Sequence, residues 1–402
     1  MDVRLLGTGG RDGWPQPGCN CASCGRARLA GPGRAPGRVL LDGALEIVPD
    51  QSPFPAGCGS GARGTGTGQV GAHQVEPVPG GWDITSPDGG RLLVAAGPGA
   101  VPRPPDGSRP YDVALLDLLE WPAQLGELRA RRLVGDRTVV TALYADHRVT
   151  SAAELARRCQ LWHAAMPADG RTLTSPATGT GRGAPAASQR PPRGRILVLG
   201  GARSGKSREA ELRLAAEPRV TYLAAGPLAG GVRARDQDAS DQDASNPDAS
   251  NPGTGDSWIG PDGIADTEWA RRVAAHRARR PPWWRTVESA DVAGMLRSES
   301  GALLIDGIGT WLAAVLDETG AWTEDRAAEE KIAERVAELV AAWRQTTAHV
   351  VAVSDQVGSG VHPATRSGRM FRDQLGWLNQ RLAAESEQTV LVVAGRVTIL
   401  PT

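Results

Sequence analysis

The sequence predicts an α/β protein whose C-terminal half is a parallel sheet with helices on both faces. Five short apolar runs have the character of buried strands: residues 195–199, 219–224, 302–306, 349–354 and 389–394. Helical patterns separate them, and in residues 325–346 apolar side chains recur at helical spacing, at Ile332, Val336, Leu339, Val340 and Trp343. Strands that alternate with helices favour parallel order, because each crossover helix covers a face of the sheet.

Length and charge restrict the class of protein. A chain of 402 residues exceeds one ordinary core and predicts two domains. The 45 basic and 45 acidic residues balance, so no nucleic-acid partner is expected. The first residues lack the pattern of a signal peptide. No apolar run approaches the ~20 residues that span a bilayer. We therefore expect a cytoplasmic protein with no membrane span.

Composition shifts divide the chain. Residues 171–193 are rich in Thr, Ser, Pro, Gly and Ala and are predicted to be a flexible linker. They separate an N-terminal unit, residues 1–170, from a C-terminal unit, residues 194–402. Residues 233–262 repeat Asp, Ala, Ser and Asn with hardly an apolar side chain, which predicts a disordered insertion. Residues 51–80 are also rich in Gly and Pro and are expected to lack regular structure.

A glycine-rich motif follows the first apolar run of the C-terminal unit and precedes a helix that is expected to begin near Glu209. It has the pattern G-x-x-x-x-G-K-[ST] in the strand–loop–helix context that gives the pattern its meaning. Its residues are Gly200, Gly201, Ala202, Arg203, Ser204, Gly205, Lys206 and Ser207. The glycines allow the backbone to curl so that N–H groups face phosphate oxygens. The sequence therefore predicts a P-loop NTPase fold that binds a nucleoside triphosphate, GTP or ATP, with Mg²⁺.

Two side chains of this motif carry its chemistry. Lys206 is expected to place its charge on the β- and γ-phosphates as a catalytic residue, and the Ser207 hydroxyl to ligate Mg²⁺. The chain contains only two lysines, Lys206 and Lys331, among its 45 basic residues. Because arginine fills almost every other basic position of this chain, a lysine at position 206 indicates that the chemistry of the motif requires lysine there.

Asp306 ends the third apolar run and is a candidate second ligand. A carboxylate at this place in a P-loop protein meets the Mg²⁺ or its water shell. A helix cap is the alternative for any aspartate that follows a strand. The motif at 200–207 favours the metal role.

His276 is the candidate nucleophile. The surrounding residues predict a helix that ends before Pro281, on which Arg272, His276 and Arg280 recur every four residues and share one face. Neighbouring guanidinium groups lower the pKa of a histidine and leave it neutral and nucleophilic. The same arginines could hold a triphosphate. The pattern alone fits equally well an exposed basic face with an incidental histidine.

An ordered series of motifs adds a resemblance. The matching stretches are residues 200–207, 220–224, 272–277, 284–288, 304–306, 310–312, 353–363, 369–373 and 376–383. Together they resemble the bifunctional adenosylcobinamide kinase/adenosylcobinamide-phosphate guanylyltransferase family over essentially the whole C-terminal half. Several independent motifs in order make the resemblance specific.

The resemblance implies two reactions. The first phosphorylates adenosylcobinamide with a nucleoside triphosphate. In the second, His276 attacks the α-phosphate of GTP, and the resulting His–GMP passes GMP to adenosylcobinamide phosphate. The resemblance also implies a homo-oligomer. It places around the nucleotide Ala224, Ala225, Gly226, Arg277, Ala278, Arg279, Arg280, Glu288 and Asp306.

Departures from the family pattern keep alternatives open. This chain has Asp355-Gln356 where the family usually shows Asn-Glu, which could weaken a metal or substrate contact. The insertion at 233–262 need not disturb the fold, because added loop length costs little free energy. A chain that keeps only the guanylyltransferase, and a P-loop scaffold whose catalysis has decayed, are the two alternatives.

The N-terminal unit carries a second resemblance. Residues 5–10 and the run Cys19-Asn-Cys21-Ala-Ser-Cys24 resemble the start of metallo-β-lactamase-fold phosphodiesterases, particularly the cyclic-phosphate branch. Such hydrolases need an H-x-H-x-D-H cluster for two metals. This unit has only His73, His147 and His163, far apart in sequence. We therefore expect a degenerate metallo-β-lactamase-like α/β domain with a structural or docking role.

A structural zinc site is the remaining hypothesis for this unit. Cys21 and Cys24 have ligand spacing, Cys19 could be a third ligand, and His147 could complete a tetrahedral shell. Three thiols so close together in a cytoplasmic protein favour a metal over free cysteines or disulfides.

Overall fold

The computed structural model describes residues 1–48, 68–96, 108–174, 193–226, 280–322 and 326–401. Two compact units make up the chain: Met1–Pro192 with Leu212–Pro218, and Arg193–Glu211 with Arg219–Thr402. The expected disordered insertion, residues 233–262, lies outside the described residues. So do His276, Arg277, Ala278 and Arg279.

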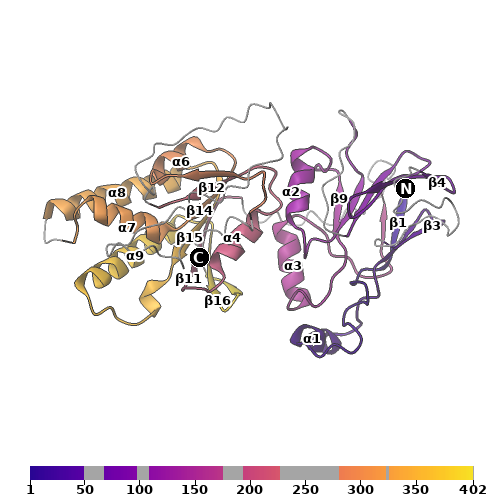
Figure 1. Ribbon diagram of the computed structural model, residues 1–402, viewed down its shortest axis with the longest axis horizontal. Helices are drawn as coiled ribbons and strands as arrows, with labels where there is room; N and C mark the ends of the chain where they lie inside the picture. Colours follow the sequence, from indigo (N-terminus) through magenta and orange to yellow (C-terminus); the bar gives the residue numbers. More distant parts are fainter. Residues whose placement is uncertain (49–67, 97–107, 175–192, 227–279, 323–325, 402) are drawn as a thin grey trace, which may run out of the picture. The chain divides into compact units, whose positions relative to one another are not determined.

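The C-terminal unit is built on one sheet with the strand order β13-β12-β14-β15-β11-β16-β17 (Figure 1). The strands are β11 (Arg195–Gly200), β12 (Val220–Ala224), β13 (Arg285–Glu288), β14 (Ala302–Asp306), β15 (His349–Asp355), β16 (Gln388–Val393) and β17 (Arg396–Ile399). All neighbours are parallel except β16 and β17. The five predicted strands are confirmed. The sequence analysis did not identify β13 and β17, two short edge strands with little burial.

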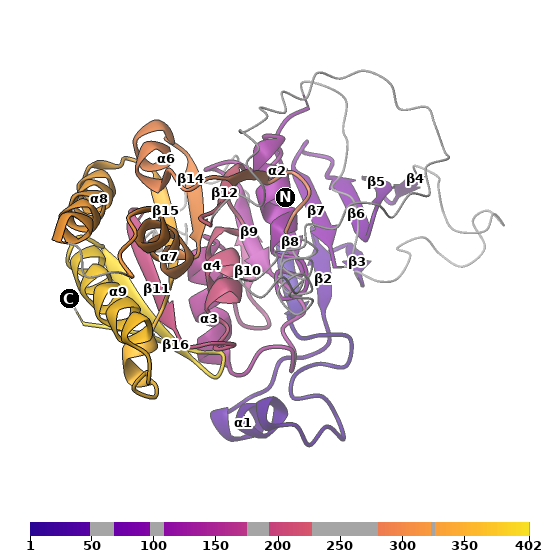
Figure 2. The same ribbon diagram turned by 60° about the vertical axis from the view of Figure 1, so that its left-hand side comes forward.

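Helices cover this sheet. On one face lie α6 (Val292–Ser298), α7 (Ile308–Glu318), α8 (Arg326–Gln345) and α9 (Arg366–Ala384); α4 (Lys206–Leu214) lies on the other side (Figure 2). One buried cluster joins sheet residues such as Leu197, Leu303 and Val350 to Trp311 of α7 and Trp343 of α8. The apolar stripe predicted for residues 325–346 is buried at all five positions. Helix α4 begins at Lys206, three residues before the expected start.

The N-terminal unit contains two sheets. The smaller has the order β10-β1-β2-β3 and the larger the order β4-β5-β6-β7-β8-β9. The strands are β1 (Asp2–Gly7), β2 (Arg38–Leu41), β3 (Leu45–Ile47), β4 (Gly68–Val70), β5 (His73–Val78), β6 (Gly81–Thr85), β7 (Arg91–Ala95), β8 (Val113–Leu116), β9 (Val139–Ala142) and β10 (Thr172–Thr174). Val3 and Leu5 of the smaller sheet share a core with Ile84 and Val113 of the larger, so the two sheets pack face to face.

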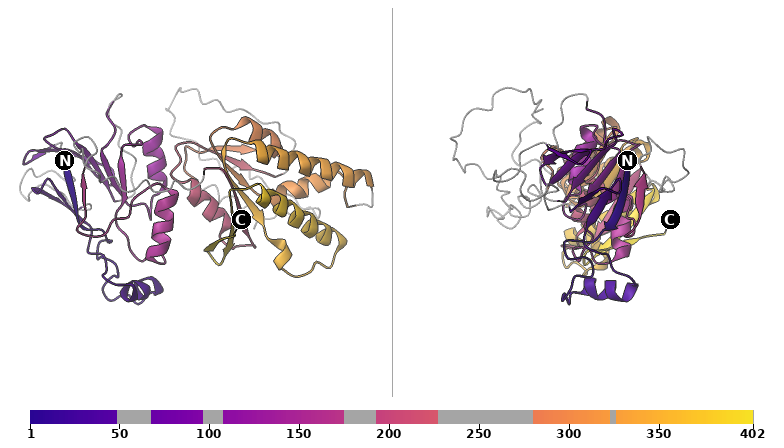
Figure 3. Two further views of the ribbon diagram at one scale, coloured as in Figure 1. Left: turned by 180° about the vertical axis from the view of Figure 1, so that it is seen from behind. Right: turned by 90° about the vertical axis from the view of Figure 1, so that its right-hand side faces the viewer.

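Two helices cover the other face of the larger sheet, α2 (Ala123–Ala130) and α3 (Ala152–Leu161). Their residues Leu128 and Leu155 share a second core with Leu93 and Leu116 of that sheet. Figure 3 shows these helices in magenta beside the strands. A further helix, α1 (Ala22–Ala30), is capped by Cys21, whose sulfur accepts a hydrogen bond from the backbone N–H of Cys24.

Two expectations for irregular segments need correction. Strands β4 and β5 lie within residues 51–80, which were expected to lack regular structure; His73 and Val75 alternate inward and are buried, a strand signal that the surrounding Gly and Pro obscured. Strand β10 lies within residues 171–193, the expected linker, because Thr172–Thr174 pair with β1. Of the helices that the structure describes, none is long and apolar enough to cross a membrane.

Candidate functional site

The glycine-rich motif forms a tight loop between β11 and α4. Gly205 has φ +98°, and Arg203 also adopts a positive φ, of 56°. A Cβ at Gly200 would lie 2.4 Å from the Ser204 Oγ and 2.8 Å from the Val392 carbonyl oxygen. The backbone N–H of Gly395 donates to the Ser204 carbonyl at 2.8 Å, so the β16–β17 turn supports the loop. Gly205 is therefore required for its backbone conformation, and Gly200 for the close approach of Ser204 and Val392.

Lys206 opens α4 and lies at the mouth of the loop. Its ammonium group lies 2.8 Å from the Asp355 carboxylate and donates to the Gly201 carbonyl oxygen at 3.3 Å. Asp355 ends β15 directly opposite Gly200 of β11. The carboxylate that replaces the usual family asparagine therefore pairs with the lysine expected to bind phosphate.

Ser207 contacts the second candidate ligand. Its hydroxyl donates to Asp306 Oδ1 at 3.3 Å. Asp306 Oδ2 accepts a short hydrogen bond from the Tyr222 hydroxyl. The structure thus brings together the two oxygen groups expected at a Mg²⁺ site, and adds a phenol behind them.

Arg280 is the one residue of the expected 277–280 segment that the structure describes. Its guanidinium lies over the Tyr222 ring, 3.3 Å from the centroid, in cation–π geometry. Its Nη1 also lies 3.5 Å from the Thr286 hydroxyl, on the neighbouring strand β13. Arg280 is therefore connected to Asp306 through a single aromatic side chain.

The remaining expected nucleotide residues lie at the carboxyl ends of adjacent strands. Ala224 pairs with both Glu288 and Asp306 in the parallel register. The N–H of Ala225 donates to the Asp306 carbonyl, and Gly226 lies beside the Thr310 side chain. In open α/β sheets this edge is where ligands bind.

The donor set fits a Mg²⁺-bound nucleotide. Ser207 and Asp306 offer the hydroxyl and carboxylate oxygens that Mg²⁺ prefers. The loop backbone has the curled form that cradles phosphates. Within the described residues the buried Ser204 hydroxyl has no hydrogen-bond partner, which leaves one donor inside the loop for a ligand oxygen.

Half of the chain is similar to known proteins. The family described as cobinamide kinase / cobinamide phosphate guanyltransferase matches residues 253–400. The bifunctional adenosylcobalamin biosynthesis protein CobU of Salmonella typhimurium is 33% identical over 214 residues, which cover 50% of this chain and 96% of the relative. The protein of the same description called CobP, from Pseudomonas aeruginosa, is 35% identical over 207 residues, 50% of this chain and 94% of the relative.

The chain belongs to the cobinamide kinase / cobinamide phosphate guanyltransferase family. The family match extends from before β13 through β17 and so includes Asp306 and Asp355. Because each relative aligns over nearly its full length with half of this chain, the other half is additional to the part shared with these relatives.

Two residues that contact Asp306 or Asp355, namely Tyr222 and Asn379, were assigned no role from the sequence. Tyr222 lies in a motif quoted for the resemblance, but no local pattern indicates that its hydroxyl reaches Asp306. Asn379 of α9 accepts from the Ser354 hydroxyl at 2.6 Å and donates to the Asp355 carbonyl at 3.1 Å. A lone buried asparagine on an otherwise apolar helix face is the signal that could have identified it.

The N-terminal unit contains a separate cluster of metal-ligating side chains. The ligand atoms of Cys19, Cys21, Cys24 and His147 all lie within 4.8 Å of one another. His147 Nδ1 lies 3.6 Å from the Cys19 sulfur and 3.9 Å from the Cys24 sulfur. The Cys24 N–H lowers the pKa of the Cys21 thiol, whereas burial raises the pKa of Cys24. Three sulfurs and one imidazole fit tetrahedral zinc.

Arg148, the residue after His147, fixes this part of the chain. Its guanidinium binds the carboxylates of Asp117 and Glu120, both at 2.9 Å, and of Asp146 at 2.8 Å. Burial raises the pKa of Asp117 even though Arg148 opposes this effect. An arginine thus supplies the positive charge at which three acidic side chains converge.

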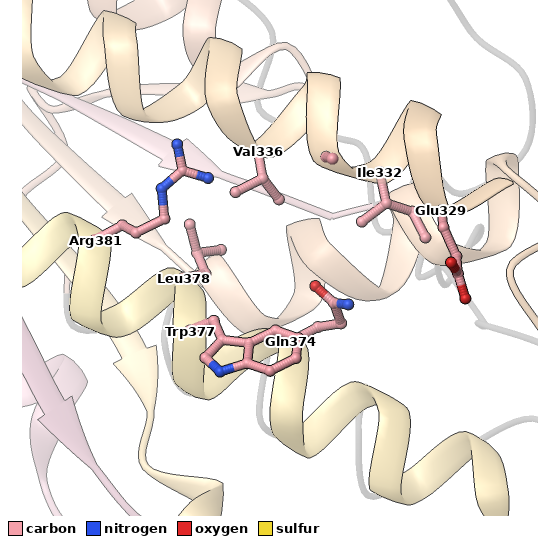
Figure 4. Close-up of a pocket in the computed structure, with 8 residues that line it drawn as sticks. Glu329, Ile332, Val336, Gln374, Trp377, Leu378 and Arg381 are labelled. Carbon is pink, nitrogen blue, oxygen red and sulfur yellow. The ribbon is translucent and has the colours of Figure 1, made fainter. Parts of the chain in front are cut away.

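A hollow between α8 and α9 lies on the C-terminal unit (Figure 4). Ile332, Val336 and Leu378 form its apolar part, and Trp377 is 59% exposed. Glu329 and Arg381 lie toward its two ends. Its lining is that of a packing surface, whereas the groups suited to phosphate chemistry lie at the strand ends.

Proposed function

We propose that the chain is a bifunctional adenosylcobinamide kinase and adenosylcobinamide-phosphate guanylyltransferase of cobalamin biosynthesis. The observation that carries the proposal is the P-loop in which Lys206 and the Ser207–Asp306 pair meet at one sheet edge, in a chain of this family. The printed descriptions of its relatives as bifunctional adenosylcobalamin biosynthesis proteins support it.

In the kinase step the substrate hydroxyl oxygen forms a bond to the γ-phosphorus of GTP or ATP, and the nucleoside diphosphate leaves. Lys206 binds phosphate oxygens and stabilises the charge that develops on them. Ser207 and Asp306 would hold Mg²⁺, which when bound neutralises phosphate charge. The hydroxyl proton passes to solvent.

In the transfer step His276 forms an N–P bond to the α-phosphorus of GTP, and pyrophosphate leaves. A phosphate oxygen of adenosylcobinamide phosphate then attacks that phosphorus, the N–P bond breaks, and the histidine is free again. Ala224, Ala225, Gly226, Glu288 and Arg280, with Arg277, Ala278 and Arg279, are proposed to surround the nucleotide. Covalent catalysis divides one difficult transfer into two displacements.

Incubation with α-labelled GTP tests this proposal. We expect acid-labile label on the wild-type chain and none on His276→Ala. Labelled GTP that binds tightly without covalent transfer would favour the scaffold alternative. Transfer without phosphorylation of adenosylcobinamide would favour a guanylyltransferase alone.

For the N-terminal unit we propose a degenerate metallo-β-lactamase-like domain that holds a structural Zn²⁺ through Cys19, Cys21, Cys24 and His147. The convergence of these side chains and the lowered pKa of Cys21 support the zinc site. We expect about one zinc per chain in the purified protein. Cys21→Ser should remove it, whereas Cys159→Ser, at a described cysteine that is not one of the four ligands, should not. Wild-type protein without zinc would refute the site.

The resemblance also supports proposals about assembly and location. We propose that the protein self-associates and acts in the cytoplasm, where nucleoside triphosphates are available. Sedimentation equilibrium measures the first, and a single species with the mass of one chain would refute it.

A further inference from the structure

Tyr222 occupies an unusual place for a buried aromatic residue. It is 1% exposed in the middle of β12, next to β14, which ends in Asp306. Its hydroxyl donates to Asp306 Oδ2, and the Arg280 guanidinium lies over its ring, 3.3 Å from the centroid. One side chain therefore contacts both the expected metal-binding carboxylate and the end of the segment that carries His276.

A packing role alone does not explain these contacts. Phenylalanine would fill the same volume, whereas the phenol hydroxyl is directed at a carboxylate. That carboxylate's other oxygen accepts from Ser207 at 3.3 Å, so the tyrosine fixes which oxygen faces the loop.

The stacked arginine completes the connection. Arg280 follows His276 by four residues in the sequence. Its Nε is buried and has no hydrogen-bond partner among the described residues, so the contact with the aromatic face and the Thr286 hydroxyl hold the guanidinium. A guanidinium with few hydrogen bonds depends on that ring for its orientation.

We propose that Tyr222 is a positioning residue that holds both the Mg²⁺ ligand Asp306 and Arg280 in place. Only the contribution of Arg280 to GMP transfer rests on the proposed function. The Tyr222 hydroxyl sets the orientation of the Asp306 carboxylate, and the Tyr222 ring sets the position of the Arg280 guanidinium. One side chain therefore positions both the carboxylate expected to hold Mg²⁺ and an arginine expected to contact the nucleotide.

Two variants separate the two contacts. Tyr222→Phe keeps the ring and removes the hydroxyl, and Tyr222→Leu removes both. We expect Tyr222→Phe to raise the Mg²⁺ concentration for half-maximal GTP binding about tenfold, since a hydrogen bond to a charged group is lost. GTP binding without Mg²⁺ should change less than about twofold. Tyr222→Leu should in addition slow His276 labelling about tenfold at saturating Mg²⁺.

Tyr111 provides a matched control in the N-terminal unit. Its hydroxyl also donates to a carboxylate, Asp83 at 2.6 Å, and an arginine, Arg91, also lies over its ring at 4.4 Å. Tyr111→Phe therefore makes the same chemical change at a residue outside the set expected to surround the nucleotide. It should leave the Mg²⁺ dependence of GTP binding unchanged.

The outcomes are distinct. Wild-type Mg²⁺ dependence in Tyr222→Phe would overturn the role of the hydroxyl. Equal labelling rates for the Phe and Leu variants would overturn the coupling to Arg280. If Tyr222→Leu does not fold, Arg280→Lys tests the same contact with the tyrosine intact, and unchanged labelling would overturn the coupling. Absence of label in the wild type would refute the transferase function, while the Mg²⁺ dependence of GTP binding would still test the hydroxyl.

Discussion

Lys206 faces two competing anions, the carboxylate of Asp355 and the phosphates of a bound nucleotide. The ammonium–carboxylate distance is 2.8 Å, and the Asp355 side chain is 38% exposed. A phosphate that engages Lys206 must compete with this ion pair and also lie close to its negative charge. We therefore expect the aspartate that stands at the position of the usual family asparagine to oppose nucleotide binding.

We predict that Asp355→Asn strengthens GTP binding about two- to fivefold, because a partly exposed ion pair contributes up to about 1 kcal/mol. Equilibrium titration at low salt measures the change. Asp317→Asn, an exposed acid at the end of α7, is the control and should have no effect. Weaker binding by Asp355→Asn would indicate that the carboxylate itself assists the nucleotide or its metal.

Individual site residues differ in how far sequence could identify them. Gly205, Lys206 and Ser207 are fixed by spacing within one loop, so a local pattern identifies them. The Lys206–Asp355 pair joins residues far apart in sequence, and it depends on β15 lying beside β11. Tyr222 reaches Asp306 for the same reason, through the register of β12 with β14. Such contacts arise from strand order, which the sequence analysis did not determine.

At the scale of elements, different contacts hold the two ends of β11. Its carboxyl end leads into the phosphate loop, and its first residue, Arg195, is fixed by Glu387, just before β16. The Arg195 Nε lies 3.1 Å from a Glu387 oxygen, and further hydrogen bonds join the same two residues. These bonds lower the pKa of Glu387 below its usual value of 4.5.

The lowered pKa predicts a pH dependence of stability. A carboxylate whose pKa is lower in the folded chain stabilises the fold above its unfolded-state pKa, and this contribution is lost as the pH falls through the lowered value. We expect Glu387→Gln to flatten the loss of unfolding free energy between about pH 5 and 3, measured by urea denaturation. Glu330→Gln, whose ion pair with Arg326 is highly exposed, should leave the curve unchanged.

Elements with strong periodicity were predicted well, and short ones were not. The long helix α8 was predicted from its stripe, since seven of its residues are buried on one side. Strands β4, β5 and β10 lie in segments whose Gly, Pro and Thr content indicated loops. Strands β4 and β10 have only three residues each, and β10 exists because β1 offers it a partner. Pairing of this kind is a tertiary effect that composition does not encode.

For the whole molecule, two units with different chemistry share one chain. The C-terminal unit offers oxygen ligands for a hard cation, and the N-terminal unit offers sulfur and imidazole for zinc. In the N-terminal unit the Arg148 guanidinium binds Asp117, whose side chain is 5% exposed. Removing that positive charge would leave a buried carboxylate without its ion pair.

We predict that Arg148→Met lowers the unfolding free energy of the N-terminal unit by about 2–3 kcal/mol, because the buried Asp117 carboxylate loses its hydrogen bond to an arginine that is itself 30% exposed. Arg38→Met breaks a half-exposed pair with Glu46 in the same unit and should cost less than about 1 kcal/mol. Chemical denaturation followed by tryptophan fluorescence measures both. GTP affinity of Arg148→Met should equal that of the wild type, and a parallel loss would show that the units do not act independently.

The scarcity of lysine makes the proposed phosphate-binding residue chemically addressable. Only two lysine side chains of this chain offer amines to an acylating reagent: the exposed Lys331 and Lys206, whose side chain is 16% exposed. Peptide mapping by mass spectrometry after brief acetylation can therefore locate each modified lysine. Protection of Lys206 relative to Lys331 would report how much of a sample carries nucleotide, without a label, a fluorophore or an assay of turnover.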